Sequence, residues 1–118
     1  MLVTDIHHVS LNVSDTETAL RFYRDVLGME VLDRPDFGFA GAWLDAGNGR
    51  QVHLIEAPVP PDSGQHMAFR VDDIVAVITE LRAAGFSVPD GRSVPGTPIR
   101  QTFVNDPDGN RIEFTQPA

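Results

Sequence analysis

The chain carries HVSLNVSD at residues 8–15 and HMAFRVDD at residues 66–73, and these two stretches align with each other without a gap. In both, apolar residues recur at every second position, which is typical of a strand with one buried face. Both stretches end in polar residues that favour the start of a helix. The chain therefore begins the same strand and the same helix twice.

The first copy continues with a helix and three short strands. Ser14 and Glu17 have the spacing of a capping box, and apolar residues recur at helical intervals up to Gly28. This pattern predicts an amphipathic helix of about three turns that stops at the glycine. Short apolar stretches separated by Pro and Gly then predict three antiparallel strands, at residues 29–32, 42–44 and 51–55.

The second copy repeats this order. Asp72 or Asp73 caps a predicted helix that ends at Gly85, and further strands follow as far as Thr115. The Pro-containing segment 58–64 cannot form a regular element, so we interpret it as a linker. The sequence thus predicts a single α+β domain over residues 1–118, built from two repeat modules, residues 5–57 and residues 65–116.

Composition excludes several classes of protein. The 118 residues include no Cys and no Lys and carry a net charge of -8, so disulfides, thiolate or Schiff-base catalysis and a P-loop lysine are absent. The acidic balance and the scattered Arg residues disfavour a nucleic-acid partner. Neither a membrane-spanning apolar run nor the features of a signal peptide are present. We therefore expect a cytoplasmic protein with no membrane partner.

The repeat singles out four residues that could carry chemistry. His8 and His66 occupy the same place in the first strand of each copy. Residues 52–55 align with residues 112–115, so that His53 and Glu113 share a place in the last strands. Alternation directs these side chains away from the apolar positions, and we expect all four on one concave face.

Three imidazoles and one carboxylate make a suitable set of ligands for a divalent metal ion. In the alternative interpretation, the histidines are hydrogen-bonded structural residues and the glutamate is a solvated surface group. His53 has a further alternative, since a neutral imidazole can act as a base or line the pocket. His7 points to the other side of the strand and is interpreted as structural or exposed.

Other residues are candidates for contacts with a substrate. Ser10 shares the face of His8, and Arg70 shares the face of His66. Arg100 follows a Pro- and Gly-rich stretch and could clamp a carboxylate or a phosphate, or it could be an ordinary exposed Arg. Trp43, with the segment 34–39, forms either an aromatic pocket wall or ordinary core. Residues 106–110, DPDGN, predict a tight hairpin without chemistry.

These motifs together resemble the vicinal oxygen chelate superfamily, which includes glyoxalase I, bleomycin-resistance proteins and extradiol dioxygenases. The resemblance covers almost the whole chain and is carried by HVSLNV at 8–13, ALRFYRDVLG at 19–28, HMAF at 66–69 and DPDGNRIE at 106–113. It implies paired βαβββ modules that form a half-barrel cradle, and a homodimer. It also implies one divalent metal ion per site, Zn, Ni, Mn, Co or Fe, held at the positions of His8, His53, His66 and Glu113.

The resemblance also implies a function. In glyoxalase I the second ligand position holds a Glu that also transfers a proton, and this chain has His53 there. We expect a metal-dependent lyase or isomerase of glyoxalase type, acting on a small substrate that chelates the metal through vicinal oxygens, with His53 and Glu113 as catalytic residues. The alternatives are a non-catalytic small-molecule or antibiotic binding protein and an Fe(II)-dependent ring-cleaving dioxygenase.

Overall fold

The computed structural model describes residues 1–118, and the chain divides into two compact units, Met1–Pro60 and Pro61–Ala118. Each unit has one strand, one helical segment and then three strands. The elements of the first unit are β1 (His8–Val13), α1 (Thr16–Leu20), η1 (Arg21–Val26), β2 (Glu30–Leu32), β3 (Gly41–Asp45) and β4 (Gln51–Glu56). Those of the second unit are β5 (Met67–Arg70), α2 (Ile74–Ala83), β6 (Arg92–Ser93), β7 (Arg100–Asn105) and β8 (Arg111–Gln116).

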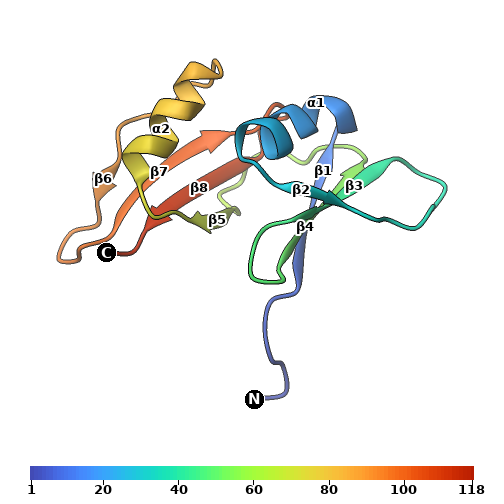
Figure 1. Cartoon of the computed structure of the whole chain (residues 1–118), viewed down its shortest axis with the longest axis horizontal. Coiled ribbons are helices and arrows are strands. Elements are labelled where there is room, and N and C mark those ends of the chain that lie inside the picture. The colour runs from blue at the N-terminus through green and yellow to red at the C-terminus, as the bar shows by residue number, and fades with distance from the viewer. The chain divides into compact units, whose positions relative to one another are not determined.

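The first unit is a four-stranded sheet in the order β1-β4-β3-β2 (Figure 1). The strand β1 runs parallel to β4, whereas β3 runs antiparallel to both β4 and β2. Parallel neighbours need a crossover connection, and here the helix and the two other strands supply it. The helix α1 packs against β4, and so covers one face of the sheet.

The second unit has the same topology, with strand order β5-β8-β7-β6. Its first and last strands, β5 and β8, are again parallel neighbours. The helix α2 lies on β7 and β8, as Figure 1 shows for this unit. Both sheets are open, and the α+β prediction with two βαβββ modules is confirmed. None of the helices is long and apolar enough to span a bilayer.

The core of each unit lies between its sheet and its helix. Alternation along the strands sends every second side chain to the helix side, where apolar residues lose contact with water. The buried apolar residues of the first unit are Val13, Ala19, Leu20, Phe22, Tyr23, Ala42, Leu44, Val52 and Leu54. Those of the second unit are Ile74, Ile78, Leu81, Val88, Val104, Ile112 and Phe114. The opposite face of each sheet is left for polar and aromatic side chains.

The first helical segment differs from the sequence prediction at its start. The predicted capping box is wrong, because Asp15 rather than Ser14 is the N-cap residue. An Asp15 carboxylate oxygen accepts hydrogen bonds from the backbone N–H of Thr18 (2.9 Å) and from its hydroxyl (2.8 Å). The helix begins at Thr16, so the carboxylate of Asp15 is the group that reaches the third helical N–H.

The second half of this segment is a π-helix, η1, rather than a continuation of the α-helix. The backbone N–H of Leu27 donates to the carbonyl oxygen of Phe22, five residues earlier. This winding puts more residues into each turn, which brings adjacent side chains closer to one face. Accordingly, Phe22 and Tyr23 are both fully buried, with ring centroids 4.8 Å apart. The predicted stop at Gly28 is confirmed by its positive φ of 82°.

Two strands are shorter than the alternation alone predicts. The strand β1 begins at His8, because its parallel partner β4 begins at Gln51, which lies opposite His8. Ile6 consequently remains exposed. Likewise β5 begins at Met67, one residue after His66. The predicted hairpin at residues 106–110 is confirmed, since it joins the antiparallel strands β7 and β8.

Candidate functional site

The register of the two sheets gives the predicted site residues equivalent positions. In the first unit Ser10 lies opposite His53, and in the second Ala68 lies opposite Glu113. His8 is two residues before Ser10, and His66 is two residues before Ala68. Period-two alternation therefore places His8 with His53, and His66 with Glu113, on the sheet face away from the helix. Each unit thus brings together one predicted donor pair.

In the second unit the donor pair is His66 and Glu113. His66 Nε2 lies 2.9 Å from Glu113 Oε1, and His66 Nδ1 lies 2.9 Å from the carbonyl oxygen of Gly64. A carbonyl oxygen only accepts, so Nδ1 carries a hydrogen, and the ring presents Nε2 to the carboxylate. The ring of Phe103 approaches His66 edge-on, at 5.4 Å between centroids. The imidazole is therefore held in one orientation beside Glu113.

The electrostatics of this pair favour a charged imidazole when nothing else occupies the site. The carbonyl of Gly64 and then the carboxylate of Glu113 raise the pKa of His66 above its ordinary value. With Nδ1 donating to the carbonyl, a proton on Nε2 completes the ion pair with Glu113. A metal ion in the place of that proton would use the lone pair of Nε2 and the same carboxylate.

In the first unit His8 and His53 lie in a stack of three rings. The rings of His8 and His53 are parallel within 14°, with centroids 4.0 Å apart. On the other side of His53 the indole of Trp43 lies parallel within 10°, at 4.5 Å. Trp43 is directly opposite His53 in the pairing of β3 with β4. Trp43 is thus outside the helix-side core and forms an aromatic wall beside the histidines.

One nitrogen of His53 is engaged within its own strand. His53 Nε2 lies 2.8 Å from Gln51 Oε1, and an amide oxygen only accepts, so Nε2 carries the hydrogen. Burial lowers the pKa of His53 below its ordinary value, and the charges of His8, His7 and Arg34 lower the pKa further. The neutral ring therefore keeps its lone pair on Nδ1. That atom is the one available as a metal ligand or a base.

The donor chemistry of both pairs fits a divalent metal ion. Metal-ligating histidines commonly donate a hydrogen bond through the ring nitrogen that does not bind the metal. Nδ1 of His66 donates in this way to the carbonyl of Gly64, and Nε2 of His53 donates to the side-chain amide of Gln51. Imidazole nitrogens with one carboxylate suit Zn, Fe, Ni, Co and Mn. Neither unit by itself holds a group of three or more metal-ligating side chains. Each unit holds one pair, and the four-residue ligand set remains a prediction.

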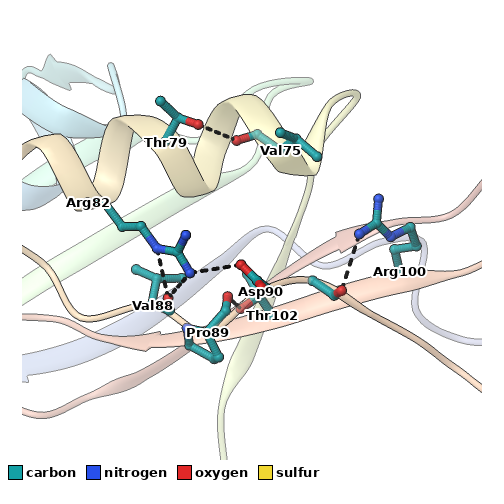
Figure 2. Close-up of polar contacts among 9 residues, drawn as sticks. Val75, Thr79, Arg82, Val88, Pro89, Asp90, Arg100 and Thr102 are labelled. Atoms are coloured by element: carbon teal, nitrogen blue, oxygen red, sulfur yellow. Dashed lines mark hydrogen bonds and ion pairs between the residues drawn. The ribbon is translucent and has the colours of Figure 1, made fainter.

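The remaining predicted residues are placed less uniformly. Ser10 and Arg70 lie on exposed positions of the same faces as the donor pairs. Arg100, in contrast, pairs with Gln116 and alternates with the buried Thr102, so it lies on the helix side of its sheet. Its guanidinium donates to the carbonyl oxygen of Gly91 at 3.2 Å (Figure 2). The structure does not bring Arg100 together with Glu113.

The structure adds groups that the sequence analysis did not assign. Gln51 lies two residues before His53 and so on the same face of the strand. Period-two alternation in the sequence was enough to identify it as a neighbour of His53. The carbonyl of Gly64 carries no sequence signal at all, because any residue has one. Arg34 lies near His53, although a loop position has no periodicity that would reveal it. His7, interpreted as pointing away, has Nδ1 2.9 Å from His8 Nδ1.

The chain matches one family model over almost its full length. Residues 5–114 match the Glyoxalase/Bleomycin resistance protein/Dioxygenase superfamily. Among curated proteins, the chain is 34% identical over 123 residues to a lactoylglutathione lyase of Haemophilus influenzae, covering 94% of this chain and 91% of that protein. Such coverage means that the similarity includes both units.

Solved structures give the same result. A glyoxalase family protein from Bacillus anthracis has a TM-score of 0.87 and 30% identity, covering 100% of this chain and 98% of that one. TnmS3, an antibiotic binding protein from Streptomyces sp. CB03234, has a TM-score of 0.84 and 30% identity, covering 100% and 99%. From the matched residues, the repeated topology and these similarities, the chain belongs to the Glyoxalase/Bleomycin resistance protein/Dioxygenase superfamily.

Proposed function

We propose that this protein is a metal-dependent lyase or isomerase of glyoxalase type, acting on a small substrate that presents two neighbouring oxygens. The observation that carries the proposal is the matched pair of donors at equivalent positions of the two sheets, His8 with His53 and His66 with Glu113. The similarity to a protein named lactoylglutathione lyase supports this class of reaction. The proposal includes the homodimer that the family resemblance implies and the cytoplasmic location that the sequence predicts.

In this proposal the four donors hold one divalent metal ion. When bound, such an ion acts as a Lewis acid that holds the oxygens of the substrate and stabilises the negative charge that develops on them. The carbonyl of Gly64 orients His66 by accepting from its Nδ1, and the amide oxygen of Gln51 orients His53 by accepting from its Nε2. The ligand assignment is the same whether the two pairs come from one chain or from two.

Proton transfer is assigned to His53 or to Glu113. His53 has a lowered pKa and its Nε2 is engaged by Gln51, so Nδ1 of the neutral ring serves either as a metal ligand or, in the alternative role, as the base that accepts a proton. Glu113, with Oε1 2.9 Å from His66 Nε2, is the second candidate. Trp43 would cover the side of His53 that is away from His8 and keep water from it.

The first experiment measures metal content. We expect about one metal ion per site in protein purified without chelator, and loss of metal in the His8→Ala/Glu113→Ala double variant. Glu80→Gln is the control, because Glu80 lies on the exposed side of α2 and is not among the proposed ligands. A double variant that keeps its metal, or wild-type protein that binds none on addition of Zn, Mn, Fe, Co or Ni, overturns the metal proposal.

The second experiment measures turnover. Protein loaded with each metal is assayed for formation of lactoylglutathione from methylglyoxal and glutathione, with other 2-oxoaldehyde adducts tested in parallel. His66→Ala should abolish both metal binding and activity and leave a folded protein, as judged by circular dichroism. Activity that persists in His66→Ala would rule out the proposed ligand role of this residue.

A binding protein without turnover is the second candidate function. The rings of Trp43, His53 and His8 form an aromatic stack on this face of the sheet, which a small aromatic molecule could extend, and TnmS3 is an antibiotic binding protein. A metal-free protein that binds a ligand tightly would favour this candidate. An Fe(II) dioxygenase is distinguished by oxygen uptake with a catechol, since two histidines and a carboxylate also form the ligand triad of such enzymes.

A further inference from the structure

Arg34 lies in the segment between β2 and β3, and its guanidinium is held by three contacts from that segment. One terminal nitrogen donates to the carbonyl oxygen of Phe39 at 3.1 Å. The central carbon Cζ lies 4.9 Å from the ring centroid of Phe37 and 5.1 Å from that of Phe39, which are cation–π distances. The side chain is therefore fixed rather than free to sample solvent.

Gly41 provides the space in which this guanidinium lies. A Cβ at Gly41 would lie 3.1 Å from Arg34 Nη2 and 3.3 Å from Arg34 Cζ, and would also contact the carbonyl oxygen of Leu54. Any other residue at Gly41 would therefore displace the guanidinium or the neighbouring strand. The absence of a side chain at Gly41, the first residue of β3, thus leaves space for the guanidinium of Arg34.

Arg34 adjoins the ring stack of the first unit. The ring of Phe37 lies 6.0 Å from the indole of Trp43, which in turn stacks on His53. Gly41 and Trp43 are two residues apart in β3 and so belong to one face of the sheet. A continuous line of contacts runs from Arg34 through Phe37 and Trp43 to His53.

The positive charge of Arg34 has no acidic partner in the protein. The ion pairs of the structure involve Arg24, Arg50, Arg82, Arg111 and His66. One hydrogen bond to Phe39 leaves most of the N–H groups of Arg34 without a protein acceptor. In a chain with a net charge of -8, a fixed cation without a counter-ion beside an aromatic surface is a suitable receptor for an anionic ligand.

We propose that Arg34 binds the carboxylate of a small aromatic or planar acid, whose flat part lies on Trp43 and Phe37. This inference rests on the proposed function, because it names the class of substrate for the same site: an anionic one. A carboxylate fits better than a phosphate, since a single planar guanidinium matches one monoanion.

Trp43 makes the test direct, since it is the one Trp in the chain and its fluorescence reports on this face. Metal-free protein is titrated with phenylacetate and, separately, with phenylacetamide, which has the same shape and no charge. We expect saturable quenching by phenylacetate and binding of the amide that is weaker by about 10- to 100-fold. Arg34→Gln should weaken phenylacetate binding by a similar factor, and Arg34→Lys by less.

Arg24→Gln is the matched control, because Arg24 is partly exposed and paired with Asp25 and Glu17, and this variant should bind phenylacetate as the wild type does. Circular dichroism and thermal unfolding confirm that each variant is folded. The proposal is overturned by absent or unsaturable quenching, by equal binding of acid and amide, or by an unaffected Arg34→Gln variant. Inorganic phosphate that displaces phenylacetate at equal concentration would overturn the preference for a carboxylate.

The two proposals fail separately. The metal content of Arg34→Gln should equal that of the wild type, since Arg34 is not among the proposed ligands. A protein that binds phenylacetate through Arg34 and holds no metal would contradict the proposed function and retain the anion subsite. A protein that holds its metal and does not distinguish phenylacetate from phenylacetamide would contradict the anion subsite and leave the proposed function standing.

Discussion

At the scale of single residues, the chemistry of this protein depends on what holds each imidazole. His66 donates through Nδ1 to a backbone carbonyl and faces Glu113 with Nε2, whereas His53 donates through Nε2 to Gln51. The two rings therefore expose different nitrogens, and the directions of their pKa shifts are opposite. Identity and spacing in the sequence predict both histidines as candidates but do not specify which nitrogen is free.

The raised pKa of His66 gives the metal-free protein a defined pH dependence. A raised folded-state pKa means that the stabilisation by the His66–Glu113 pair is fully present below the unfolded value of 6.5 and is lost as the pH rises through the folded value. We therefore expect Glu113→Gln to lower the melting temperature more at pH 5.5 than at pH 8.5. Glu80→Gln, on the exposed side of α2, is the control. An equal effect of Glu113→Gln at both pH values would contradict the ion pair.

Gln51 is expected to support metal binding without touching the metal. Because its amide oxygen accepts from His53 Nε2, replacing the amide by an apolar group leaves that nitrogen without its partner and the ring less well oriented. Gln51→Leu should weaken zinc binding by about tenfold or more, as measured by competition with a chromophoric chelator. Gln101→Leu, at a strand position in the second unit, should change the affinity little. Equal affinities of wild type and Gln51→Leu would show that Gln51 does not position His53.

At the scale of elements, the helical segments of the two modules end in the same way. The first segment turns at Gly28 and the second at Gly85, with φ values of 82° and 93°. Helix stops of this kind were predictable, because glycine adopts a positive φ without a Cβ penalty. The π-helical winding of η1 was not predictable, since the apolar period of this segment fits an α-helix equally well.

Replacement of either glycine should destabilise the fold through the backbone alone. A Cβ at Gly28 or Gly85 would meet no heavy atom within 4 Å, so the cost arises from the left-handed conformation and not from a clash. Gly28→Ala and Gly85→Ala should each lower the free energy of unfolding by about 1 kcal/mol, as measured by urea denaturation. Gly28→Asn should lower the free energy of unfolding by less, because Asn tolerates this conformation. An alanine variant with the same free energy of unfolding as the wild type would mean that the positive φ at this position is not required.

At the scale of the whole molecule, two units with the same topology each carry one pair of candidate donors. Because a bound metal ion stabilises only the folded state, metal binding should be visible as a gain in global stability. At a free zinc concentration of about 100 times the dissociation constant, the gain should be about 2.7 kcal/mol, seen as a higher melting temperature that EDTA reverses. The His8→Ala/Glu113→Ala variant should show no such shift. A wild-type melting temperature that is unchanged by zinc would contradict metal binding to the folded protein.

The sequence by itself determined the repeat, the α+β class, the helix stops and the four candidate donors. These features follow from local periodicity, from turn residues and from the alignment of one half with the other, all of which a linear chain carries. Only the tertiary structure decided that Arg100 lies on the helix side of its sheet, that Trp43 stacks on His53, and that Arg34 lies beside Gly41. Strand register and loop packing set these positions, and both depend on contacts between residues far apart in the chain.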